Sequence, residues 1–182
     1  MLTIMRASAA KRESRSIFSF NHTVSAMKSR ARKPSSNPVN ELLQRQQASH
    51  TVLAFKTRAA QWQMTGLHFN HLHELLGKHY ERVDAMVDEL AERNRMVRGA
   101  AVIGLAAVLK GSELTDMSAM MRDAAEYLGC LLADHEQLSE SLHRDAETAV
   151  SRGDLGTNDF FIGLLQEHQK MSWFCRTSLN QT

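Results

Sequence analysis

The sequence predicts an all-α domain built as a bundle of four long helices, and three observations lead to that prediction. Both prolines, Pro34 and Pro38, lie near the start, so the 144 residues from Val39 onward contain none. Proline costs about 3 kcal/mol inside a helix, and its absence therefore suits long helices. Apolar residues recur at helical spacing in two long segments. No segment shows the sustained alternation of apolar and polar residues that is typical of a strand.

The first helix is expected from about residue 39 to 65. Ser35, Ser36 and Asn37 form a cap-like cluster, and Pro38 suits the first turn of a helix. Gly66 marks the expected end. Glutamine and arginine interrupt the apolar positions of this segment, so its periodicity is the weakest of the four.

The second helix, from about 68 to 96, has a clear apolar stripe on one face. The stripe consists of Phe69, Leu72, Leu76, Val83, Val87 and Leu90. Gly99 and Gly104 interrupt the chain beyond it. Residues 97–116 are therefore expected to form a connector, with a small apolar helix of its own from Ala100 to Leu109.

The third helix is expected to begin near Thr115 or Asp116, both good N-cap residue types, and to reach about residue 150. A turn at 151–156 follows, and Thr157 is the expected cap of a fourth helix that ends near Leu179. Four long helices with one long second-to-third connection have ferritin-like topology. The prediction is thus a ferritin-like four-helix bundle over 38–182, with a short extra helix in that connection.

Residues 1–37 differ from the rest in charge. They carry eight cations against the single acid Glu13, a net charge of +7, whereas the remaining 14 cations and 19 acids give −5. The cations are Arg6, Lys11, Arg12, Arg15, Lys28, Arg30, Arg32 and Lys33. The segment is also rich in serine and poor in large apolar residues, so it is expected to be a disordered arm. A basic arm on an acidic body indicates a polyanionic partner, and DNA contacts through these eight residues are the main hypothesis.

Other interpretations of the arm remain open. It lacks the continuous apolar core of a secretory signal, but organellar transit peptides share its arginine-rich and acid-poor composition. An inert solubilising tail is a third interpretation. The longest apolar run in the whole chain, Ala100–Leu109, is too short to span a bilayer, so no membrane partner is expected. Two cysteines, Cys130 and Cys175, do not form a disulfide scaffold and fit a reducing cytoplasm.

A polar stripe on the second helix is the main candidate for a metal site. Its members follow one another by three or four residues: His73, Gly77, Glu81, Asp84, Asp88 and Glu92. His73 and Glu92 are about 28 Å apart along a helix, so one chain cannot bring them to the same ion. In an antiparallel pairing of this helix with its own copy, His73 faces Glu92 and position 77 faces Asp88. Such a set of nitrogen and oxygen ligands suits iron, while a solvated charged face is the alternative.

Several short motifs stand in an order that resembles one family. They are Gln61-Trp-Gln-Met-Thr-Gly66, Phe69, His73-Glu74, Asp88-Glu-Leu-Ala-Glu-Arg93, Gly153-Asp-Leu-Gly-Thr-Asn-Asp-Phe160, His168-Gln-Lys170 and Trp173. This pattern resembles the Dps mini-ferritins (DNA protection during starvation) over about residues 39–180, and most specifically over 61–93.

The resemblance implies a hollow cage of twelve subunits, cytoplasmic and associated with the nucleoid. Such cages oxidise Fe²⁺, usually with hydrogen peroxide, store the ferric mineral as protection against oxidative stress, and in many cases bind DNA without sequence preference. The family's iron site lies at the two-fold interface, which makes His73, Asp88 and Glu92 the expected metal ligands. The resemblance also places Trp62 beside the reaction as a residue that quenches radicals; its alternative is a packed aromatic.

The chain departs from the family pattern at two ligand positions. Gln61 stands where the family has its first histidine, and Gly77 where it has its first aspartate. We therefore expect a weakened ferroxidase, an oxidoreductase acting on metal ions. The alternatives are a purely structural DNA-protecting cage and an organellar mini-ferritin whose arm is cleaved.

Five other histidines have either a possible ligand role or a structural interpretation. His68, His71 and His79 are possible substitute ligands, although 71 and 79 lie off the polar stripe by helical phase. His135 and His168 are interpreted as structural, and the cysteines lack any metal-site spacing.

Overall fold

The structure, a computed structural model, describes residues 37–117 and 119–180 and confirms the all-α ferritin-like prediction. This part of the chain contains five helices and no strand. The helices are α1 (Pro38–Gln63), α2 (Phe69–Met96), α3 (Leu105–Gly111), α4 (Ala124–Ser151) and α5 (Leu155–Leu179). No helix among the described residues is both long and apolar enough to cross a membrane.

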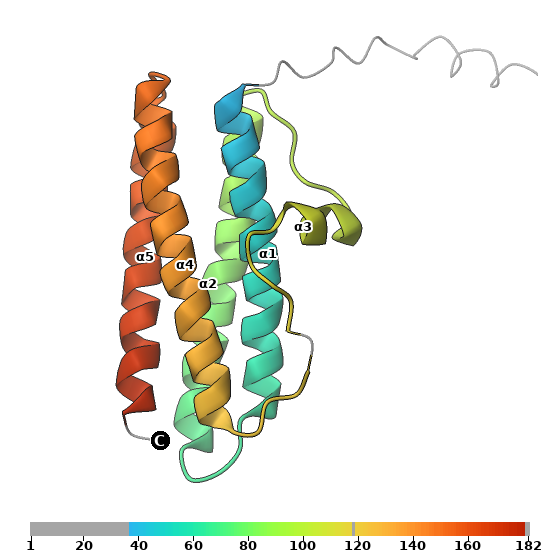
Figure 1. Ribbon diagram of the computed structural model, residues 1–182, viewed down its shortest axis with the longest axis vertical. Coiled ribbons are helices and arrows are strands. Elements are labelled where there is room, and N and C mark those ends of the chain that lie inside the picture. Colours follow the sequence, from blue (N-terminus) through green and yellow to red (C-terminus); the bar gives the residue numbers. More distant parts are fainter. Residues whose placement is uncertain (1–36, 118, 181–182) are drawn as a thin grey trace, which may run out of the picture. The chain divides into compact units, whose positions relative to one another are not determined.

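Two antiparallel helix pairs make up the bundle (Figure 1). Helices α1 and α2 form one pair, α4 and α5 form the other, and α1 packs beside α4. The short α3 lies in the connection between the pairs and packs against α1. The core between the pairs is lined mostly by leucines, including Leu43, Leu53, Leu76, Leu90, Leu128, Leu131, Leu138 and Leu142.

Helix α1 begins as the sequence predicts and is polar inside. Asn37 accepts a hydrogen bond from the Val39 amide at 3.1 Å, and Pro38 occupies the first turn. Several polar residues of this helix are buried: Gln46, Gln47, Ser49, His50, Lys56 and Thr57. These buried polar side chains explain why the apolar periodicity of this segment is weak.

The start of α4 was predicted wrongly. The helix begins at Ala124, and its N-cap is Asp123, which accepts from the Glu126 amide at 3.0 Å. Residues 112–117 instead run along α1, where Lys56 donates to the Thr115 carbonyl at 2.9 Å. Asp116 accepts only from the adjacent Met117 amide within the described residues, so it does not cap a helix.

Two further boundaries differ from the prediction. The connector helix starts at Leu105 because Gly104 has a positive φ of 89°, a conformation that glycine adopts readily and that breaks the helix expected from residue 100. Helix α5 is capped by Asp154, which accepts from the Thr157 amide at 2.9 Å; Thr157 lies one turn inside. Arg93 of α2 also contacts Asp154 at 3.0 Å and ties the two helix ends together.

The boundary expected between an arm and the bundle stays a prediction. All eight cationic residues proposed for DNA contact lie outside the described residues.

Candidate metal centres

The three predicted iron ligands lie on the outer face of α2 and do not meet within one chain. His73 is half-buried, while Asp88 and Glu92 are exposed. At 1.5 Å per residue, Asp88 is about 22 Å and Glu92 about 28 Å from His73 along the helix. One chain therefore offers parts of a site, and their joint role as ligands stays a prediction.

His73 is held in one tautomer by the end of α1. Its Nδ1 lies 3.2 Å from the backbone carbonyl of Gln61. Since a carbonyl can only accept, Nδ1 carries the proton, and the lone pair of Nε2 is available for a metal ion. The ring of Phe69 lies beside the imidazole, with 5.2 Å between the centroids.

The two departures from the family pattern are in contact with each other. The Gln61 side chain donates through Nε2 to the His73 carbonyl at 3.1 Å. This amide lies directly over Gly77, where an added Cβ would come within 2.7 Å of Nε2. Gln61 thus occupies the space that a side chain at position 77 would need, and the two departures act as one structural change.

Trp62, the expected radical quencher, lies next to Gln61 near the end of α1. Its side chain is 59% exposed, so Trp62 is not part of the core of one chain, and both the radical quencher and the packed aromatic stay open as interpretations. The guanidinium of Arg58 lies 5.9 Å from the Trp62 ring and 4.2 Å from the Tyr80 ring. The catalytic role of Trp62 stays a prediction.

A second group of histidines, which sequence reasoning did not assemble, lies inside the bundle. His50, His79, His135 and His168 come from α1, α2, α4 and α5, and each is at most 5% exposed. His79 lies off the outer stripe, as its helical phase predicts. It shares the inner face of α2 with the core residues Leu76 and Val83, which was not predicted.

Three of these histidines form a continuous hydrogen-bonded chain. His50 Nδ1 lies 2.7 Å from the Gln46 carbonyl, His50 Nε2 lies 2.9 Å from His168 Nε2, and His168 Nδ1 lies 2.8 Å from His135 Nδ1. His135 and His168 are therefore paired with each other.

Burial keeps the inner histidines neutral. Desolvation lowers the pKa of His50 and of His79 to about 4 and that of His135 to about 3. It also lowers the pKa of His168 well below its ordinary value. All four imidazoles are therefore uncharged at pH 7, the form in which a ring nitrogen binds a metal.

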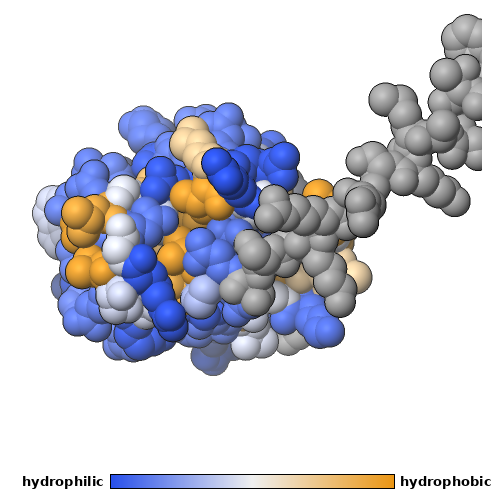
Figure 2. Space-filling model, turned by 90° about the horizontal axis from the view of Figure 1, so that it is seen from above, coloured by the Kyte–Doolittle hydropathy of each residue, from blue (hydrophilic) through white to orange (hydrophobic). Residues whose placement is uncertain are grey.

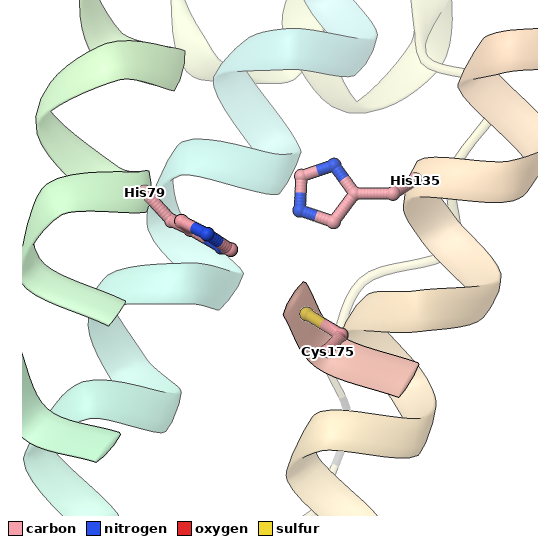
Figure 3. A group of neighbouring side chains, drawn as sticks. All are labelled: His79, His135 and Cys175. Carbon is pink, nitrogen blue, oxygen red and sulfur yellow. The ribbon is translucent and has the colours of Figure 1, made fainter. Parts of the chain in front are cut away.

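A group of three possible ligands lies where the hydrogen-bonded series of histidines ends. Its members are His79, His135 and Cys175. One ligand atom from each lies within 4.8 Å of the other two. Figure 3 shows the thiol of Cys175 and the ring of His79 directed toward the space beside His135. Burial raises the pKa of the Cys175 thiol to about 12. Sequence spacing gave no sign of this group, because its members lie on three helices.

The comparisons with known proteins agree with this architecture. A family model described as a ferritin-like domain matches residues 40–182. The Dps of Thermosynechococcus elongatus superposes with a TM-score of 0.76 at 35% identity, covering 78% of this chain and 90% of that one.

The chain belongs to the Dps mini-ferritin family.

Two curated relatives align with most of this chain. DNA protection during starvation protein 2 of Bacillus anthracis is 29% identical and aligns over 79% of this chain and 97% of its own length. An uncharacterized low temperature-induced protein of a Nostoc species is 31% identical over 76% of this chain and 78% of its own length. The family recognised from the motifs at 61–93 is thereby confirmed.

Proposed function

We propose that copies of this Dps chain assemble into a closed, cytoplasmic cage, with twelve subunits expected, that stores iron and binds DNA at the nucleoid. The match to a ferritin-like domain supports iron storage. Relatives named for DNA protection during starvation support the DNA role.

Exposed apolar side chains support assembly. Figure 2 views the bundle from the end at which α2 and α4 finish, and apolar side chains interrupt its hydrophilic surface. Met96, Val150 and Leu155, from the helix ends found there, are 47–69% exposed. On the α1 side, Phe55 and Trp62 are about as exposed. Apolar surface of this kind favours burial against further subunits.

One observation carries the iron part of the proposal. The structure fixes the His73 tautomer so that Nε2 is free, and it leaves Asp88 and Glu92 exposed on the same helix far from His73. Only a second copy, paired antiparallel along α2, brings these nitrogen and oxygen ligands to one ion. A two-fold axis then gives two equal sites per dimer.

Iron oxidation at this interface is expected to be slow. A pair of metal ions about 3.5–4 Å apart needs enough ligands to hold both. His73, Asp88 and Glu92 suffice for one ion, and the Gln61 amide blocks the space at Gly77 from which a further carboxylate would reach the second. This contact also favours the second candidate function, a structural DNA-protecting cage without ferroxidase activity.

Stopped-flow oxidation of Fe²⁺ by hydrogen peroxide tests the proposal. We expect the wild type to oxidise Fe²⁺ slowly, with nearly one Fe²⁺ bound per subunit. His73→Ala should lose this oxidation. His71→Ala, at an exposed neighbour off the polar stripe, should oxidise Fe²⁺ like the wild type. Gln61→His combined with Gly77→Asp should accelerate oxidation, since it restores both family ligands and removes the blocking amide. Rapid oxidation of two Fe²⁺ per site by the wild type would refute the ligand count. Equal rates for wild type and His73→Ala would favour the structural cage.

The basic arm is the proposed DNA contact. Twelve arms of charge +7 combine individually weak contacts into avidity. We expect DNA affinity to fall with salt with a log–log slope of about −0.9 per phosphate neutralised. Deleting residues 1–37 should abolish gel retardation while sedimentation still shows the cage. Undiminished DNA binding by that truncation would show that the arm is not responsible.

A further inference from the structure

We infer that the bundle core contains a second metal site, formed by His79, His135 and Cys175, for one Zn²⁺-type ion per chain. Two nitrogen ligands and one sulfur ligand suit Zn²⁺ or Co²⁺, and the ion would displace the proton of the buried Cys175 thiol to solvent as it binds. The site lies wholly within one chain and uses none of the proposed interface ligands. It is therefore independent of the proposed iron chemistry.

The hydrogen-bond chain determines which atom of His135 faces the site. The Gln46 carbonyl can only accept, so His50 carries its proton on Nδ1 and accepts at Nε2. His168 then donates from Nε2 and accepts at Nδ1, and His135 donates from Nδ1. Each ring is thereby fixed in one neutral tautomer. The hydrogen-bonded series ends at His135, whose Nε2 has a lone pair directed away from His168.

Two buried histidines at the His135 end of the hydrogen-bonded series have ring nitrogens without a partner among the described residues. These nitrogens are Nε2 of His135 and both ring nitrogens of His79. A buried polar atom without a partner is costly, and a metal ion satisfies it. His135 would bind the ion through Nε2 while its other nitrogen is held by His168, the arrangement typical of histidine ligands to metals.

The geometry requires a small closure around the ion. Zinc binds nitrogen at about 2.0–2.1 Å and sulfur at about 2.3 Å, so tetrahedral ligand atoms lie about 3.5 Å apart. The three ligand atoms lie within 4.8 Å of one another, and rotation of the side chains can bring them closer. The fourth position is left for water or another ligand.

A pocket gives an ion a route to the site. A cavity of about 510 Å³ opens beside α2 and α5 and has His79, Met171 and Phe174 in its lining. The charged lining of this pocket is mixed, with the carboxylates of Glu74 and Glu167 beside the cations of Lys78, Arg82 and Lys170. Once bound, the ion would link α2 to the α4–α5 pair and strengthen the junction between the two halves of the bundle.

Titration of the chelator-treated, full-length protein with Co²⁺ tests the inference. A thiolate ligand gives Co²⁺ a charge-transfer absorption band in the near ultraviolet, whereas the ligands of the interface site contain no sulfur. We expect this band to saturate at one Co²⁺ per chain and to disappear when Zn²⁺ is added. Cys175→Ser should lose the band, and the matched control Cys130→Ser should keep it.

Two further variants distinguish loss of a metal ligand from misfolding of the protein. His79→Leu, with a side chain that suits the core, should also lose the band. His168→Leu, which breaks the hydrogen bond that orients His135, should weaken Co²⁺ binding about 10- to 100-fold, and His168→Gln should restore part of it. A wild type without the band, or a band that survives Cys175→Ser or depends on Cys130, would overturn the site.

Discussion

At the residue scale, the contact of Gln61 with Gly77 links the two departures of this chain from its family. Its backbone carbonyl fixes the His73 tautomer, its amide donates to the His73 carbonyl, and the same amide fills the space over Gly77. A glycine inside a helix costs up to about 1 kcal/mol relative to alanine, and here it accommodates the glutamine.

The contact between Gln61 and Gly77 predicts a non-additive mutant cycle. Gly77→Ala in the Gln61→Ala background should stabilise the protein by up to about 1 kcal/mol through helix propensity. In the wild-type background the new Cβ displaces the Gln61 amide, so the gain should be smaller or reversed. Thermal denaturation of the four proteins measures this coupling. Equal shifts in both backgrounds would show that the two positions are independent.

At the scale of elements, a buried ion pair joins the two helix pairs. Lys56 of α1 lies 2.6 Å from Asp134 of α4, and both residues are at most 7% exposed. Burial raises the pKa of Asp134, while Lys56 acts to lower it. Lys56 also donates to Thr115, so one side chain connects α1, α4 and the connector.

Removing only one member of this pair should be costly. We expect Lys56→Met to lower the free energy of unfolding by about 3–5 kcal/mol, because it leaves the Asp134 carboxylate buried and unpaired. Lys56→Met with Asp134→Leu should recover most of that loss. The control Lys78→Met removes an exposed ion pair with Glu74 and should change stability far less, because solvent screens that pair. Denaturant unfolding compares the variants, and a small loss in Lys56→Met would show that the carboxylate is solvated or protonated.

The sequence was most informative where one face of a helix carries the signal. The bounds of α2 follow from its apolar stripe, and the observed start at Phe69 differs from the prediction by one residue. The start of α4 was missed because Thr115, Asp116 and Asp123 are all capping types, and only tertiary contacts of the connector select among them. The histidine group was missed for a similar reason, since its members are 29 or more residues apart and meet only through helix packing.

At the scale of the whole molecule, the inner histidines make the fold sensitive to acid. Unfolded histidine has an ordinary pKa near 6.5, whereas burial holds the pKa of His50 and His79 at about 4 in the folded protein. Below pH 6.5 the unfolded chain takes up protons that the folded chain does not. The stability contributed by neutral burial is present above pH 6.5 and is lost as the pH falls toward 4.

This linkage predicts how steeply the free energy of unfolding falls as the pH is lowered. Each histidine that stays neutral in the folded state should reduce the free energy of unfolding by about 1.4 kcal/mol per pH unit between pH 6 and 4.5. In chelator-containing buffer, His79→Leu should lower the slope by the equivalent of about one proton. Denaturant titrations at several pH values provide the slope. Identical slopes for wild type and His79→Leu would show that His79 is protonated in the folded state.

In the whole assembly, we expect the iron site to form only where two copies of α2 meet. Anomalous difference maps at the iron edge, from crystals soaked in Fe²⁺ without oxygen, test it most directly. We expect an iron peak at a two-fold interface, bound by His73 Nε2 of one subunit and by the Asp88 and Glu92 carboxylates of its partner. Crystals in which no iron lies at that interface, or in which His73 is not bound to the metal, would contradict it.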